Sequence, residues 1–123
     1  MTAPNIVNVA TINAKTAYLT PSNTTANVLL ANSASSNKVL KINQIIAANV
    51  TTAAVGATVA VNSAAAGSGT SYPMASAISV PTGASLIVSD KSTAFYLEED
   101  KSILVTSSTS SGITYIVSYE EIS

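Results

Sequence analysis

The 123-residue sequence contains no cysteine, histidine, tryptophan or arginine. Without cysteine and histidine, the chain offers no thiolate or imidazole metal ligand, no disulfide framework and no Ser-His-Asp or Cys-His catalytic machinery. Without arginine there is no bidentate phosphate clamp, and five lysines in a chain of net charge −1 make a poor nucleic-acid surface. We therefore expect no enzymatic activity, no cofactor, no metal and no nucleic-acid partner.

Charge of either sign is also scarce. Charged residues make up 9% of the chain, against about a quarter in an ordinary soluble domain. No charge occurs from Ile42 to Ser89, and carboxylates predominate after that. One interpretation is a monomer kept soluble by serine, threonine and asparagine. The sequence favours a second interpretation, a subunit whose surface is largely covered by neighbours, because a net charge near zero promotes association.

Long hydrophobic runs are absent as well. The most apolar window, residues 42–61, includes asparagine, glutamine and three threonines, and is too polar for a membrane span of about 20 apolar residues. Residues 1–5 show neither a basic start nor an apolar stretch, so no signal peptide is predicted. We expect no membrane partner.

The apolar residues that are present predict β-strands. They are rich in valine and isoleucine and recur with a period of two, whereas the usual helix formers are sparse. The predicted extended segments are residues 5–13, 16–20, 26–31, 38–49, 57–62, 74–80, 86–90, 95–97, 102–106 and 113–122.

The last segment alternates most clearly. One face carries Ile113, Tyr115, Val117 and Tyr119, and the other is polar except for Ile116. This pattern predicts a strand with one buried face, on which Tyr115 and Tyr119 are packing residues.

Turn-forming residues separate the segments. Residues 81–84, Pro-Thr-Gly-Ala, predict a tight turn that joins 74–80 to 86–90 as a hairpin. Residues 98–101 predict a second hairpin between 95–97 and 102–106. The Ala-, Gly- and Ser-rich stretch 64–71 predicts a loop.

Short strands with turns at this spacing predict an all-β fold, an antiparallel β-sandwich that is jelly-roll-like. We expect residues 35–123 to form the sandwich domain and residues 1–34 to form an extended N-terminal arm or added edge strands. Such an arm adds a strand to a neighbour's sheet edge. Its predicted anchors are Ile6, Val7, Val9 and Ile12.

The remaining candidate residues are charged or aromatic. The carboxylates at 98–100 are consecutive, which does not suit a Ca²⁺ site, so we interpret them as a solvated turn or as partners of a neighbour's lysine. Tyr72 is the exposed-aromatic candidate, beside the predicted loop. Possible intersubunit ion pairs would join lysines and carboxylates drawn from Lys15, Lys38, Lys41, Glu98, Glu99, Asp100, Glu120 and Glu121.

Four stretches resemble a group of small virion structural proteins of tailed bacteriophages. These stretches are 38–46 (KVLKINQII), 78–88 (ISVPTGASLIV), 95–103 (FYLEEDKSI) and 117–121 (VSYEE). They are similar to that group's K-x-x-I-x-x-I strand, with one more residue between the lysine and the first isoleucine, and to its V-P-x-G-x-x-L turn, Y-L-E-x-G-D-x-I turn and V-S-Y-E-E ending. The chain departs from the group at Glu99-Asp100-Lys101, where a Gly-Asp pair is more usual.

The resemblance implies a non-enzymatic component of a shell or tail. The first hypothesis is a capsid decoration (cement) protein on the virion surface, with the major capsid protein and copies of itself as partners and a homo-oligomeric state. The alternative is a tail, collar or fibre component that acts as a receptor-binding or adhesin module. The absence of a fibrous shaft repeat favours the first hypothesis.

Overall fold

The computed structural model describes residues 7–123, which contain no α-helix. One short 3-10 turn, η1 (Lys91–Thr93), interrupts a series of strands. The strands are β1 (Ile12–Leu19), β2 (Asn27–Asn32), β3 (Val39–Asn49), β4 (Val55–Asn62), β5 (Ser71–Val80), β6 (Ser85–Ser89), β7 (Phe95–Leu97), β8 (Lys101–Ser107) and β9 (Ile113–Ile122).

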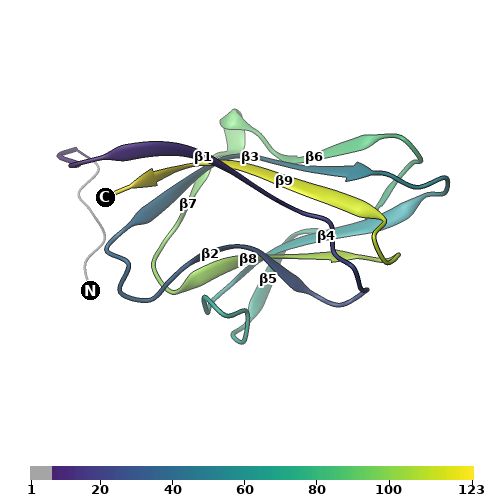
Figure 1. Ribbon diagram of the computed structural model, residues 1–123, viewed down its shortest axis with the longest axis horizontal. Coiled ribbons are helices and arrows are strands. Elements are labelled where there is room, and N and C mark those ends of the chain that lie inside the picture. The colour runs from purple at the N-terminus through teal and green to yellow at the C-terminus, as the bar shows by residue number, and fades with distance from the viewer. Residues whose placement is uncertain (1–6) are drawn as a thin grey trace.

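The strands form two antiparallel sheets that lie face to face (Figure 1). In sheet A the order is β1-β9-β3-β6, and β7 pairs with β3 beyond the end of β6. In sheet B the order is β2-β8-β4-β5. Strand β6, the turn η1 and β7 together therefore act as one interrupted edge strand of sheet A.

The pairing is nested about the middle of the chain. Strand β4 pairs with β5, β3 with β6 and β7, β2 with β8, and β1 with β9. A long antiparallel ribbon folded over in this way gives two four-stranded layers with the jelly-roll strand order. The predicted fold class, an all-β antiparallel sandwich of jelly-roll type, is confirmed.

Residues 7–34 contribute one edge strand to each sheet. Strand β1 pairs with β9 along its whole length, and β2 pairs with β8. The two extended segments predicted at 5–13 and 16–20 correspond to one described strand at 12–19, and residues 7–11 form no strand.

The two predicted hairpins are wrong, although their turns are present. Residues 81–84 form the tight turn, with the Ala84 N–H donating to the Pro81 carbonyl at 3.1 Å. However, β5 before it belongs to sheet B and β6 after it belongs to sheet A. Residues 98–100 likewise carry the chain from β7 in sheet A to β8 in sheet B.

Two buried asparagines hold these crossings. The Asn49 Nδ2 group, at the end of β3, donates to the Val80 carbonyl at 2.8 Å, and its backbone N–H donates to the Ala84 carbonyl at 2.9 Å. The Asn32 Nδ2 group, at the end of β2, donates to the Leu97 carbonyl at 3.0 Å. Each asparagine binds the chain where it leaves one sheet for the other, so each turn bridges the layers and does not close a hairpin.

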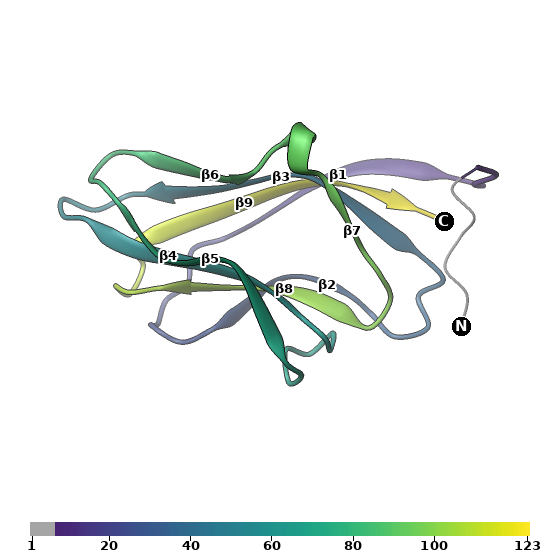
Figure 2. The same ribbon diagram turned by 180° about the vertical axis from the view of Figure 1, so that it is seen from behind.

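A third buried asparagine organises the hairpin between β4 and β5. The Asn62 Nδ2 group donates to the Gly69 carbonyl and the Ser71 hydroxyl, and its Oδ1 atom accepts from the Ala64 and Gly69 N–H groups. The predicted loop over 64–71 is confirmed, at residues 63–70. Figure 2 shows this hairpin from the side of β5.

The core lies between the two sheets. Ile113, Tyr115 and Val117 of β9 are fully buried in it, as their alternation predicts. Tyr119 is half-buried and packs against the same core, and Ile116 points away from it. Both predicted packing tyrosines therefore contact the core.

Candidate interaction surfaces

Within residues 7–123, no group of three or more aspartates and glutamates is placed to hold a metal ion. No helix in that part of the chain is long and apolar enough to cross a membrane. The features that follow are surfaces on the two sheets and at their edges.

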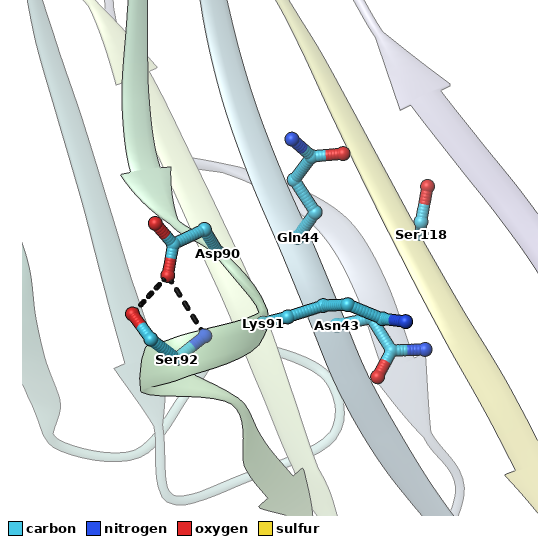
Figure 3. Close-up of a pocket in the computed structure, with 6 residues that line it drawn as sticks. All are labelled: Asn43, Gln44, Asp90, Lys91, Ser92 and Ser118. Carbon is cyan, nitrogen blue, oxygen red and sulfur yellow. Dashed lines mark hydrogen bonds between the residues drawn. The ribbon is translucent and has the colours of Figure 1, made fainter.

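An open depression lies on the outer face of sheet A beside η1 (Figure 3). It has a volume of about 540 Å³ and is open to solvent. A bulge in β3 after Ile42 places Asn43 and Gln44 side by side on this face. The residues that line the depression are Asn43, Gln44, Asp90, Lys91, Ser92 and Ser118.

The carboxylate in this depression, that of Asp90, accepts hydrogen bonds from the adjacent turn η1. Asp90 caps η1: its Oδ1 atom accepts from the Ser92 N–H at 2.9 Å and from the Ser92 hydroxyl at 2.6 Å. These hydrogen bonds hold the pKa of Asp90 below its usual value. The Asn43 amide donates to Glu120 at 2.9 Å. The depression thus presents amides, hydroxyls and one lysine, and one oxygen of its carboxylate is engaged in capping η1.

An apolar row crosses the outer face of sheet A at right angles to the strands. Tyr18 of β1 lies opposite Ile116 of β9, Ile116 lies opposite Ile46 of β3, and Ile46 lies opposite Ile87 of β6. The neighbours of each residue along its strand face the core, so these four side chains face outward. Tyr18 is 77% exposed and Ile87 is 58% exposed. We call Tyr18, Ile116, Ile46 and Ile87 the apolar row.

A second row on the same face carries both signs of charge. Ala14 of β1 lies opposite Glu120 of β9, Glu120 lies opposite Lys41 of β3, and Lys41 lies opposite Tyr96 of β7. Between this mixed row and the apolar row lie Thr16, Ser118 and Gln44, which carry no charge. The outer face of sheet A therefore carries an apolar row, an uncharged polar row and a mixed row that contains both signs of charge.

Strand β5 forms the exposed edge of sheet B. It pairs with β4 on one side, and almost all of its residues are exposed. Tyr72 is 62% exposed, and Met74 and Ile78 are exposed beside it in a strand without charge. Pro73 and two register shifts interrupt the backbone ladder that strand addition would need. A partner at this edge would therefore contact mainly its side chains.

The predicted arm anchors differ in their positions. Ile6 lies outside the described residues. Val7 is 91% exposed, and Val9 is half-buried. Ile12 is paired through its backbone with Ile122 of its own chain, while its side chain is exposed.

Two of the lysines proposed for intersubunit ion pairs meet a carboxylate of their own chain. Lys15 and Lys38 both contact Glu121, at 3.3 and 3.0 Å. The hydrogen bond from Lys38, followed by that from Lys15, holds the pKa of Glu121 below its usual value, and partial burial opposes them. Glu121 thus joins β9 to β1 and to the start of β3.

Two carboxylates of the 98–100 turn also have partners within the chain. Glu99 accepts from the Asn37 N–H at 3.0 Å, and Asp100 accepts from the Ala65 N–H at 3.3 Å. No ion pair of Glu98 or Lys41 occurs within the described residues. Lys41 and Glu120 are directly opposite on neighbouring strands, but Glu120 is bonded to Asn43.

Comparison with protein-family models finds no match for this chain, and comparison with curated proteins finds no significant similarity.

Proposed function

We propose that this chain is a non-enzymatic structural subunit of a virion, a capsid decoration protein that binds the outside of a shell of major capsid protein. The observation that carries the proposal is the β5 edge, on which Tyr72, Met74 and Ile78 are exposed in an uncharged strand. A long exposed apolar edge is an aggregation hazard in an isolated protein, and becomes stable when a partner covers it.

Two further observations support this proposal. The sequence resembles small virion proteins of tailed bacteriophages over residues 38–121, and a jelly-roll sandwich is an architecture used in viral shells. The chain also carries too little charge for attachment by ion pairs, and Lys15 and Lys38 are already paired with Glu121. The N-terminal arm, with Ile6, Val7, Val9 and Ile12 as anchors, would supply a second contact to the shell.

A tail, collar or fibre module that binds a host receptor is the second candidate. Tyr72 favours it, because an exposed tyrosine ring beside the 63–70 loop is a surface on which a sugar ring can stack. In the first candidate the same ring is an anchor in a protein interface, where tyrosine is enriched.

The test uses particles of the phage that encodes this chain, prepared without it. Purified chain is added back and the particles are sedimented. Wild-type protein should saturate the shell, and the Tyr72→Ser/Met74→Ser variant should bind at least about tenfold more weakly, as expected on losing a central aromatic anchor. Val50→Ser, which alters an exposed valine in the β3–β4 loop, is the matched control and should bind normally.

Electron microscopy of the rebound, labelled chain separates the two candidates. Label distributed over the shell supports the decoration protein. Label confined to the tail or collar, together with binding of the purified chain to host cells, would establish the receptor-binding module in its place. Normal binding of the Tyr72→Ser/Met74→Ser variant to the shell would remove the β5 edge from the interface.

A further inference from the structure

The outer face of sheet A is a separate candidate surface from the β5 edge. Its apolar row takes one residue from each of four adjacent strands, in the order Tyr18, Ile116, Ile46 and Ile87. A sheet face that is exposed to water normally carries polar residues, such as the flanking Thr16, Ser118 and Gln44. A continuous apolar row across the sheet therefore indicates a face that packs against another protein surface.

The order of residues within the rows identifies the partner. Sheet A has a centre line between β9 and β3, with β1 outside β9, and β6 and β7 outside β3 (Figure 1). In the mixed row, Glu120 and Lys41 lie on opposite sides of this line, and Ala14 and Tyr96 lie at the two ends of the row. Two copies can stack with the outer faces of sheet A together, about a twofold axis that lies between them and parallel to this line. Each residue of a row would then face the residue of the other copy that occupies the equivalent position on the opposite side of the line.

The contacts that result are complementary. Glu120 of each copy faces Lys41 of the other, so two pairs of opposite charge form. The small Ala14 side chain faces the large Tyr96 ring. Ile116 of each copy faces Ile46 of the other copy, and the Tyr18 ring of each copy faces Ile87 of the other.

The shape of the edge fits the same arrangement. The turn η1 stands above sheet A at the β6–β7 edge (Figures 1 and 2). The twofold axis places it against β1 of the other copy, near Ala14 and Thr16, where the outward side chains are small. Two such sheets stack about 10 Å apart with their strands crossing at about 30°, as in other face-to-face sheet packings.

We propose that two copies of this chain form a twofold-symmetric dimer through the outer faces of sheet A, with the apolar rows in contact and Glu120 of each copy paired with Lys41 of the other. This proposal does not depend on the virion role, because the dimer forms from the purified chain alone. The β5 edges of both copies remain exposed at the outside of the dimer.

The first test is sedimentation equilibrium of the purified chain. The wild-type protein should have twice the mass of one chain. Ile116→Lys places a charge in the centre of the apolar row and should give a monomer, and Ile87→Ser, at the edge of the row, should weaken the dimer at least about tenfold. Tyr72→Ser, on the opposite sheet, is the control and should remain dimeric. Thermal unfolding shows that each variant is folded.

The second test reads the symmetry directly. In a Glu120→Lys homodimer, each new lysine faces Lys41 of the other copy. In a Lys41→Glu homodimer, each new glutamate faces Glu120. Each variant alone should therefore dimerise about tenfold more weakly than wild type at low salt. Mixed together, the two variants form a heterodimer in which both contacts join opposite charges, and dimerisation should be restored.

Three results would overturn the proposal. A wild-type chain that remains monomeric at about 100 μM has no such dimer. A dimer that survives Ile116→Lys but is lost in Tyr72→Ser is formed by the β5 edge. Two charge variants whose mixture dimerises no better than either alone would show that Glu120 and Lys41 do not face each other across a twofold axis.

Discussion

The hydroxyl group of Tyr115 on β9 donates a hydrogen bond to the carbonyl oxygen of Thr106 on β8. Strand β9 belongs to sheet A and β8 to sheet B, so this one side chain crosses the whole core and joins the two layers. The tyrosine is fully buried. Its ring therefore contributes apolar packing and its hydroxyl fixes the separation of the sheets at one point.

Replacement of Tyr115 separates these two contributions. Tyr115→Phe removes the hydrogen bond and should lower the free energy of unfolding by about 1 kcal/mol. Tyr115→Ala also empties the space of the ring and should lower it by about 3–5 kcal/mol. Urea unfolding of both variants measures the difference. Tyr72→Phe, at an exposed tyrosine on the opposite sheet from the proposed dimer face, is the matched control and should unfold like wild type. Equal losses for Tyr115→Phe and Tyr115→Ala would contradict the packing role.

Burial of Tyr115 also predicts a loss of stability at alkaline pH. Burial raises the pKa of Tyr115 from 10.0 to about 12, and a backbone hydrogen bond from Thr58, which pairs with Thr106, opposes this only in part. Above pH 10 the unfolded chain releases the proton while the folded chain retains it, so the free energy of unfolding falls as the pH rises. The fall attributable to Tyr115 approaches about 1.4 kcal/mol per pH unit and ends above pH 12.

The check is to compare wild type with Tyr115→Phe between pH 9 and about pH 11.5. The variant lacks the ionisable hydroxyl, so its stability should fall less steeply over this range. Parallel curves for the two proteins would show that Tyr115 titrates alike in the folded and unfolded states.

Comparison of Asn49 with Asn23 tests whether the buried asparagine stabilises the crossing between the sheets. In both, the Oδ1 atom accepts from the N–H and the hydroxyl of a threonine two residues later. Asn49 is buried, however, and its Nδ2 group also binds the Ala53 and Val80 carbonyls. Asn49→Ala should therefore lower the free energy of unfolding by about 2–3 kcal/mol, and Asn23→Ala by under about 1 kcal/mol. Similar losses at both sites would mean that the crossing does not depend on the buried amide.

The hydrogen bonds just before β1 show how much of the N-terminal arm can be removed without disturbing that strand. The N–H groups of Ala10 and Thr11 donate to the Ser123 carbonyl, and β1 begins at Ile12. Deletion of residues 1–9 therefore spares β1 and should leave a folded chain, as thermal unfolding would show, while lowering occupancy on phage particles. Wild-type occupancy by the shortened chain would show that Ile6, Val7 and Val9 are dispensable for attachment.

Local patterns in the sequence predict the strands, because alternation along one strand reports which face is buried. Ile113, Tyr115 and Val117 are examples, and their burial is confirmed. The two hairpins were predicted wrongly because a tight turn such as Pro81–Ala84 has the same residues whether it closes a hairpin or crosses between sheets. The difference lies in distant partners, Asn49 and Asn32, whose roles depend on burial.

The apolar row could not be predicted from the sequence for a related reason. Ile116 is visible as an apolar exception on a polar face, but its neighbours Tyr18, Ile46 and Ile87 come from strands far apart in the chain. Only the register of three strand pairs brings them into one line. Within β3, a bulge after Ile42 shifts the alternation and places Asn43 and Gln44 on the same face, which a simple period of two does not reveal.

The most direct test of the proposed function is the number of copies of this chain on purified phage particles before and after a wash in about 1 M sodium chloride. Exposed ion pairs are screened at this ionic strength, whereas apolar contacts persist. A decoration protein that covers the capsid shell should be present in hundreds of copies per particle. If its contact is the uncharged β5 edge, these copies should be retained through the wash. Absence of the chain from the particles, a count of only a few to tens of copies, or clean release by the salt would contradict a decoration protein held by apolar contacts.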